Sequence, residues 1–175
     1  MSEIRNDWKL EEVIKLFNMP FNELLFEAHE THINNHKKDM VQVCTLLSIK
    51  TGGCPEDCGY CSQSIHSDDP IEATPLMSLE EVGKKAKIAR DQGSTRFCMG
   101  AAWRRPSNKN IDRVIKMIDV VHNLGMESCV TLGMLSEDQA IRLSKSGLNY
   151  YNHNIDTSRE HYTKVISTRN YQDRL

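Results

Sequence analysis

Four short runs of apolar residues punctuate the chain, and each has the length of a β-strand. The runs are Val41–Ile49, Thr95–Ala102, Met126–Leu135 and Leu148–Ile155. Between them, apolar side chains recur every three to four residues, as on one face of a helix. The clearest such stripe comprises Ile111, Val114, Ile115, Ile118 and Val121. Strand and helix patterns that alternate in this way predict βα units and a parallel sheet.

Polar residues and glycines mark the ends of the expected helices. Ser78 with Glu81, and Ser136 with Gln139, have the spacing of a capping box, in which each residue's side chain satisfies the other's backbone N–H. The first box opens a helix over Leu79–Gln92. The two helices that begin at these boxes, and the helix that carries the stripe from Ile111 to Val121, are each followed by a glycine, which supplies the left-handed residue that reverses the chain. These glycines are Gly93, Gly125 and Gly147.

Residues 1–40 are predicted to form a helical lead-in before the first strand. Apolar positions recur at helical spacing from Trp8 to Phe17, Pro20 interrupts the pattern, and it resumes from Leu24. A last helical stretch is expected over Ser158–Ser167. We therefore expect two parts, residues 1–40 and residues 41–175, and no low-complexity tract marks a further domain.

Four βα units allow two α/β folds, a small open sheet or the first half of an eight-stranded (β/α) barrel. A complete TIM-type barrel takes about 250 residues, whereas this chain has 175. We favour the partial TIM-type barrel, with about four βα units after N-terminal helices, because of the chemistry described below. On that interpretation the chain is a truncated N-terminal half, and its last strand has an unpaired edge.

The composition allows a buried core and argues against several classes of protein. Hydrophobic residues make up 39% of the chain and charged residues 26%. The net charge of −2 offers no basic surface for nucleic acid. No apolar run approaches the roughly 20 residues of a membrane span, and the polar start of the chain lacks the apolar core of a secretion signal. We expect a cytoplasmic protein.

The six cysteines are therefore expected in a reducing compartment, where metal or catalytic roles are more common than disulfides. Three of them, Cys54, Cys58 and Cys61, fall close together in the segment Thr51–Ser64. This segment follows the first strand, at the end where parallel βα folds place active sites. Thiolates this close repel one another unless a cation neutralises them, so a metal centre is expected.

The spacing Cys-x-x-x-Cys-x-x-Cys favours an iron–sulfur cluster over zinc. Structural zinc takes four ligands, usually as two Cys-x-x-Cys pairs, and no fourth cysteine or well-spaced histidine lies nearby. A 4Fe–4S cluster normally takes four cysteines, so three leave one iron open. The triple, with Tyr60 before its last cysteine, resembles the signature of the radical S-adenosylmethionine superfamily. That resemblance implies that the open iron binds S-adenosylmethionine, whose cleavage yields a 5′-deoxyadenosyl radical.

Three other cysteines suggest a second centre. Cys44, Cys98 and Cys129 are expected near the middle of the first three strands. Because side chains alternate along a strand, one cysteine per strand at a similar height can point into a common interior. Three ordinary core cysteines would give the same pattern, so the spacing alone leaves both interpretations open.

The resemblance sharpens to the biotin synthase family in four segments, TGGCPEDCGYCSQS, RFCMGAAWRRP, MESCVTLGML and YYNHNID. They stand in the family's order and spacing, and the likeness extends from about residue 8 onward. It implies that Cys98 and Cys129 bind a 2Fe–2S cluster inside the barrel, whose other ligands, a cysteine and an arginine, lie on later strands. Cys44 falls where the family has a small polar residue, and we interpret it as packing near that cluster.

The same resemblance assigns roles at the barrel mouth. It implies that Tyr60 lines the adenine end of the S-adenosylmethionine site and that Asn154 and Asp156 bind the ribose hydroxyls. It also implies that Asn152 faces dethiobiotin. The implied reaction is the radical insertion of sulfur into dethiobiotin to form biotin, a sulfurtransferase activity. A flavodoxin-type electron donor and a homodimer of the full-length protein are further implications.

The alternatives are another radical S-adenosylmethionine enzyme, sulfur-inserting or methylating, and a non-catalytic iron–sulfur or zinc module. Cys98 and Cys129 argue against a single-cluster relative, which has no need of them. Because half of the inner ligands belong to later strands, we expect the 175-residue chain alone not to form biotin.

Two further groups of polar residues are assigned no function. His29, His32 and His36 lie at helical spacing but not in the His-Glu-x-x-His arrangement of a metalloprotease, and we interpret them as a solvated helix face. Arg104 and Arg105 could bind an anion, but we favour an ordinary basic loop.

Overall fold

The structure is a computed structural model that describes residues 5–175. Residues 1–4, the beginning of the predicted helical lead-in, lie outside the described residues. The chain divides into one unit that ends at Val41 and a second unit of Gln42–Leu175. The described part of the first unit holds two helices, α1 (Leu10–Phe17) and α2 (Phe21–Asn35). Pro20 directly precedes α2. Proline has no backbone N–H, and it is tolerated there because the first N–H groups of a helix have no partner within the helix. The predicted interruption at Pro20 is confirmed.

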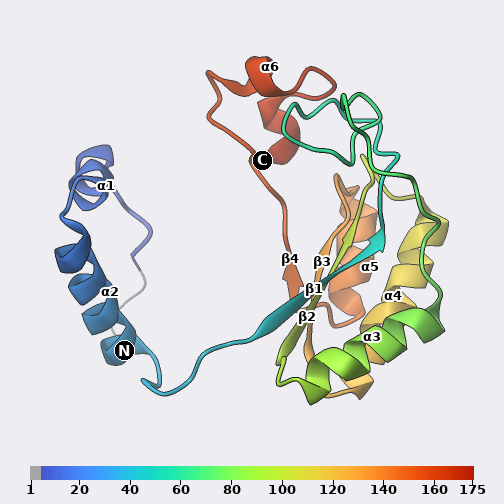
Figure 1. The fold of residues 1–175 in the computed structure, drawn as a ribbon, viewed down its shortest axis with the longest axis horizontal. Coiled ribbons are helices and arrows are strands. Elements are labelled where there is room, and N and C mark those ends of the chain that lie inside the picture. Colours follow the sequence, from blue (N-terminus) through green and yellow to red (C-terminus); the bar gives the residue numbers. More distant parts are fainter. Residues whose placement is uncertain (1–4) are drawn as a thin grey trace. The chain divides into compact units, whose positions relative to one another are not determined.

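The second unit is built on a parallel sheet of four strands in the order β1-β2-β3-β4 (Figure 1). The strands are β1 (Cys44–Lys50), β2 (Arg96–Ala101), β3 (Glu127–Thr131) and β4 (Tyr150–Tyr151). The crossovers carry the helices α3 (Leu79–Asp91), α4 (Asn108–Asn123) and α5 (Glu137–Lys145). Sequential parallel strands joined by helices are the arrangement of a (β/α) barrel. The predicted α/β fold, a partial TIM-type barrel, is confirmed.

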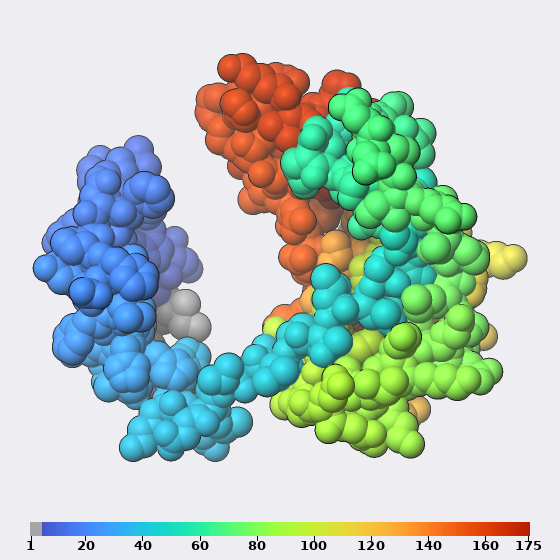
Figure 2. Space-filling view, in the orientation of Figure 1, coloured from blue at the N-terminus to red at the C-terminus, as the bar shows by residue number. Residues whose placement is uncertain are grey.

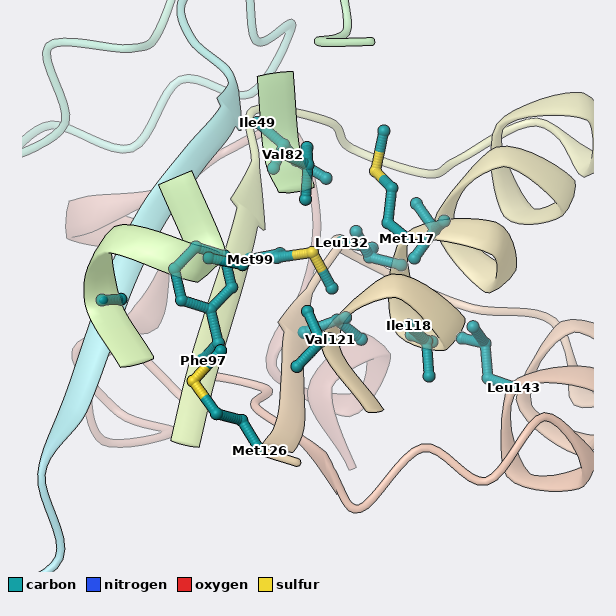
Figure 3. Packing of buried hydrophobic residues seen from close by; sticks show 14 of the residues in the cluster. Ile49, Val82, Phe97, Met99, Met117, Ile118, Val121, Met126, Leu132 and Leu143 are labelled. Atoms are coloured by element: carbon teal, nitrogen blue, oxygen red, sulfur yellow. The ribbon is translucent and has the colours of Figure 1, made fainter. Parts of the chain in front are cut away.

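The core of this unit lies between the sheet and its helices. Helix α3 packs against α4, and α4 packs against β3 and α5. Figure 3 shows the side chains that fill the space between them, and the largest that are fully buried include Phe97, Met99, Ile111, Met117, Ile118 and Leu132. Four members of the predicted stripe on α4 have no exposed surface, and Ile115 packs against them. The stripe therefore faces the core, as its spacing predicts.

The predicted helix ends are also observed. The Ser78 side chain accepts a hydrogen bond from the Glu81 N–H, and the Ser136 side chain accepts one from the Gln139 N–H, so both capping boxes are present. Ser107 caps α4 in the same way, although its sequence lacks the box that marks the other two. The three predicted glycines all have positive φ.

Two predicted elements are much shorter than expected. The run Leu148–Ile155 contributes only two residues to the sheet, because the last bond to β3 is from the Asn152 N–H to the Val130 carbonyl. The stretch Ser158–Ser167 is helical only in α6 (Tyr162–Val165), and the chain ends in a 3₁₀ helix, η1 (Tyr171–Arg174). Helix α6 stops early because the Ser167 N–H donates to the Asp57 carboxylate instead of continuing the helix.

Candidate functional site

The cysteine loop, Thr51–Ser64, follows the carboxyl end of β1 and is closed by its own backbone. The Cys54 N–H donates to the Gln63 carbonyl (2.9 Å), and the Ile65 N–H donates to the Cys54 carbonyl (3.0 Å). The Cys61 N–H donates to the Cys58 carbonyl (3.0 Å), so these two cysteines share a tight turn. Figures 1 and 2 show this loop beside the C-terminal segment, coloured red. The loop therefore gathers all three thiols at one end of the sheet.

A glycine at position 52 is required by the close approach of another backbone segment. Gly52 has φ +67°, and a Cβ at this position would lie 2.6 Å from the Ile71 carbonyl oxygen. The Lys50 Nζ donates to the Gly52 carbonyl and to the Ala102 carbonyl, so it ties the start of the loop to the end of β2. These contacts fix where the loop leaves the sheet.

The donor atoms of the loop suit a cluster of several irons. Cys54, Cys58 and Cys61 are free and partly buried. Burial raises the pKa of the Cys58 thiol, and the Arg169 guanidinium opposes this rise. Within residues 5–175, no three Cys, His, Asp or Glu side chains are grouped so as to hold a single metal ion. Three thiols around one cavity fit an iron–sulfur cluster, in which each thiolate binds a different iron.

A cavity of about 160 Å³ opens between the cysteine loop and the carboxyl ends of β2, β3 and β4. Its lining includes every residue predicted for the outer site, namely Cys54, Cys58, Tyr60, Cys61, Asn152, Asn154 and Asp156. Strand β2 contributes Ala101, and β3 contributes Thr131. The parallel sheet thus brings separate segments of the sequence to one cavity, at the end where such folds place their sites.

Asp156 is the centre of a buried polar network beside this cavity. Its side chain is 2% exposed, and it accepts hydrogen bonds from the Tyr60 hydroxyl (2.5 Å) and from the Arg169 Nη2 (2.9 Å). Burial, the largest single cause, raises the pKa of Asp156, but these two hydrogen bonds and the charges of Arg169 and Arg174 together leave the pKa lowered. Burial and Asp156 together raise the pKa of Tyr60, so its hydroxyl remains a donor. Among the non-glycine residues of 5–175, Asp156 alone has a positive φ, +74°.

Three charged residues of this network were not predicted from the sequence. Glu56 is buried and pairs with the Arg169 Nη1 (3.1 Å) and the Arg104 Nε (3.2 Å). The Arg174 Nε lies 3.5 Å from an Asp156 oxygen. One available signal was the acidic pair inside the cysteine loop, Pro-Glu-Asp. Nothing marked the two arginines near the C-terminus, because they follow a stretch whose pattern predicts only a further helix.

A second pair of thiols lies deeper along the strands. Cys98 on β2 and Cys129 on β3 are partners in the register, and both are buried. Burial, together with the hydrogen bond to Cys129, raises the pKa of Cys98 to about 12. Because side chains alternate along a strand, Cys129 faces the same side as Thr131, which lines the cavity. The pair therefore lies one layer below the cavity.

Cys44 does not join this pair. It is the first residue of β1 and pairs with Arg96, whereas Leu46 is the residue opposite Cys98. Its thiol is exposed. The prediction that Cys44 lies mid-strand at the height of Cys98 is wrong, because β1 begins at Cys44 and not at Val41.

The remaining polar groups are explained by local contacts. The rings of His32, which is partly buried, and His36, which is exposed, stack with centroids 5.5 Å apart. Arg104 donates to the Thr168 carbonyl (2.8 Å) in addition to its ion pair with Glu56. Arg104 therefore braces the cysteine loop against the C-terminal segment, while Arg105 is exposed.

A sequence model of the Radical SAM superfamily matches residues 48–175, which include the cysteine loop and the ends of β2, β3 and β4 that form the cavity. This match covers most of the chain, and the chain belongs to the Radical SAM superfamily. Membership implies an iron–sulfur cluster and S-adenosylmethionine as cofactors.

Curated relatives narrow the similarity further. The biotin synthase of Ruthia magnifica is 58% identical over 175 residues, which are 100% of this chain and 54% of the relative. The biotin synthases of Thioalkalivibrio sulfidiphilus and Novosphingobium aromaticivorans are each 57% identical, over 52% and 48% of their own lengths. The chain spans about half the length of the curated relatives it matches. Over residues 5–175, we find no helix with the length and apolar character needed to cross a bilayer.

Proposed function

We propose that this chain forms part of an enzyme that inserts sulfur into dethiobiotin to give biotin. The observation that carries the proposal is the presence of two separate thiol sites on one partial barrel. Three partly buried thiols surround the cavity, and the pair Cys98–Cys129 lies deeper on the same strands. The similarity to three bacterial biotin synthases supports it. Residues 1–40 are proposed to be a helical lead-in and residues 41–175 the first half of the barrel.

Cys54, Cys58 and Cys61 are proposed to hold a 4Fe–4S cluster with one iron open to S-adenosylmethionine. When bound, the cluster supplies the electron that starts the radical chemistry. The chain contributes geometry: the Cys54 N–H and carbonyl close the loop, and Lys50 anchors it to β2. These contacts hold the thiols at the mouth of the sheet.

The polar residues at the end of β4 are proposed to bind the two small molecules. Asn154 and Asp156 are assigned to the ribose hydroxyls of S-adenosylmethionine, Tyr60 to its adenine end, and Asn152 to dethiobiotin. All four line one cavity. A radical must meet only its intended partner, so a site that holds cofactor and substrate side by side and excludes water favours the reaction.

Cys98 and Cys129 are proposed to bind a 2Fe–2S cluster that supplies the sulfur. Their burial keeps this site away from water, and their register places both thiols at one height. Because the family's other two ligands lie on later strands, residues 1–175 alone are proposed not to complete the reaction. A flavodoxin-type electron donor, a homodimer of the full-length protein and a cytoplasmic location complete the proposal.

Iron analysis of anaerobically reconstituted protein tests the outer site. The chain is expected to bind about four irons there, and each of Cys54→Ala, Cys58→Ala and Cys61→Ala is expected to abolish that binding. Cys44→Ala is the matched control, because this thiol is exposed at the start of β1. Unchanged iron content in all three loop variants would refute the assignment.

A further inference from the structure

The guanidinium of Arg169 is buried against one of the proposed cluster ligands. Its side chain is 2% exposed, and its Nη2 lies 3.2 Å from the Cys58 Sγ. Arg169 lines the same cavity as the three cysteines of the loop. A guanidinium remains charged at any ordinary pH, so it is buried only where its donors find partners. The other hydrogen bonds of the Arg169 guanidinium therefore decide whether it can stay beside the Cys58 sulfur.

Those contacts fix the orientation of the guanidinium. The Arg169 Nε donates to the Tyr162 hydroxyl (3.0 Å), and Tyr162 is itself buried. The Nη1 pairs with Glu56 (3.1 Å), and the Nη2 also donates to Asp156 (2.9 Å). Three partners on three different segments hold one planar group, so the N–H that faces the sulfur is preorganised.

The neighbouring arginines make no comparable contact. Arg104 pairs with the same Glu56 carboxylate, but its side chain is 48% exposed and its other bond is to the Thr168 carbonyl. Arg174 faces Asp156 and His153. Within the described residues, Arg169 is the arginine that donates to a loop cysteine. Arg104 is therefore a matched control for it.

We propose that Arg169 is a positioning residue that raises the reduction potential of the cluster by donating a hydrogen bond to the Cys58 Sγ. The inference rests on the proposed function, which assigns the cluster to Cys54, Cys58 and Cys61. Hydrogen bonds to the sulfurs and nearby charge set the potentials of iron–sulfur clusters. A donor at the thiolate stabilises the reduced cluster, which carries one more electron, so the potential rises.

A redox titration of the anaerobically reconstituted protein, followed by the electron paramagnetic resonance (EPR) signal of the reduced cluster, tests this. Arg169→Gln is expected to keep the iron content and to lower the ratio of reduced to oxidised cluster about tenfold at a fixed applied potential. For a one-electron couple this equals about 59 mV. Arg104→Gln is expected to leave the potential unchanged. A wild-type potential in Arg169→Gln overturns the proposal.

A second variant covers the case in which Arg169→Gln binds no cluster, since Glu56 and Asp156 lose a buried partner. Tyr162→Phe keeps the charge of Arg169 and removes one hydroxyl, which accepts from the Arg169 Nε (3.0 Å) and donates to the Asp156 carboxylate (3.4 Å). This variant is also expected to lower the reduction potential, but by less than Arg169→Gln does. If Arg169→Gln is empty and Tyr162→Phe has the wild-type potential, the proposal is overturned. Failure of the wild-type protein to assemble a 4Fe–4S cluster is a separate result, and it overturns the proposed function itself.

Discussion

The Sγ atoms of Cys98 and Cys129 lie 3.1 Å apart on two neighbouring parallel strands. Both are free thiols, and both are buried. Because the register of the sheet already brings them to one height, neither strand has to move for both sulfurs to reach one ligand. The pair is thus part of the sheet itself and does not depend on a loop.

This geometry predicts that the inner site can be removed separately from the outer one. In a protein that includes the later strands, Cys98→Ala is expected to lose the 2Fe–2S cluster and keep the 4Fe–4S cluster, because the cysteine loop makes none of its contacts through Cys98. Absorption and Mössbauer spectra measure the two contents. Cys44→Ala should keep both clusters. A Cys98→Ala protein with a full 2Fe–2S content would contradict the assignment.

Asp57 fastens the cysteine loop to the C-terminal segment, and its removal should show in the pH dependence of stability. It accepts from the N–H groups of Ser167 (2.9 Å) and Thr168 (3.1 Å). The hydrogen bond from the Ser167 hydroxyl is the largest cause that holds the pKa of Asp57 well below its usual range. A lowered folded pKa stabilises the protein above the unfolded pKa of about 4, and this stabilisation is lost as the pH falls toward the folded value.

Asp57→Asn is therefore expected to lower the free energy of unfolding at pH 7 by about 1 kcal/mol, a figure kept small because Asp57 is only partly buried and solvent screens its charge. The variant should also lose less stability than the wild type between about pH 4 and pH 2. Urea denaturation over that range measures both effects. Parallel stability curves for the two proteins would show that Asp57 does not act through its charge.

Gly133, just after β3, lies against the backbone of the neighbouring crossover. It has φ +82°, and a Cβ there would lie 2.3 Å from the Trp103 carbonyl oxygen. Gly133→Ala is expected to cost about 3 kcal/mol of unfolding free energy through strain and overlap. Gly93→Ala is the control, because Gly93 also has positive φ but no atom within 4 Å of its Cβ position. Its cost should be about 1 kcal/mol, and equal costs in denaturation experiments would contradict the close approach.

Asn154 lines the cavity and is proposed to bind the ribose of S-adenosylmethionine. Asn154→Ala is expected to weaken S-adenosylmethionine binding about tenfold, the loss of roughly one polar contact, without lowering the iron content. Calorimetric titration of the reconstituted protein measures this. Asn123→Ala, at the exposed end of α4, should bind as the wild type does. Equal affinities for both variants would remove Asn154 from the site.

The sequence was sufficient for those parts of the fold that depend on local pattern. The capping boxes at Ser78 and Ser136 and the apolar stripe on α4 depend only on residues close together in the sequence. The structure has all three where they were predicted. The cavity was also foreseen in outline, because parallel βα units place the residues after each strand at a common edge.

The parts that depend on distant segments were not predicted. Arg169 and Glu56 meet through a fold contact between the cysteine loop and the chain's end, and a charged residue carries no local sign of such a partner. The early end of α6 has the same origin, since Asp57 takes an N–H group that helical spacing would assign to the helix. The predicted height of Cys44 in the sheet was wrong, since Cys44 pairs with Arg96 and Leu46 pairs with Cys98. The apolar run that contains Cys44 does not indicate how β1 is aligned with β2.

The most direct test is the EPR spectrum of the anaerobically reconstituted and reduced protein, recorded with and without S-adenosylmethionine. The account predicts a 4Fe–4S signal that requires Cys54, Cys58 and Cys61 and that changes when S-adenosylmethionine is added, because one iron is open to it. A protein without such a cluster, or with one whose spectrum is the same after S-adenosylmethionine is added, would contradict it.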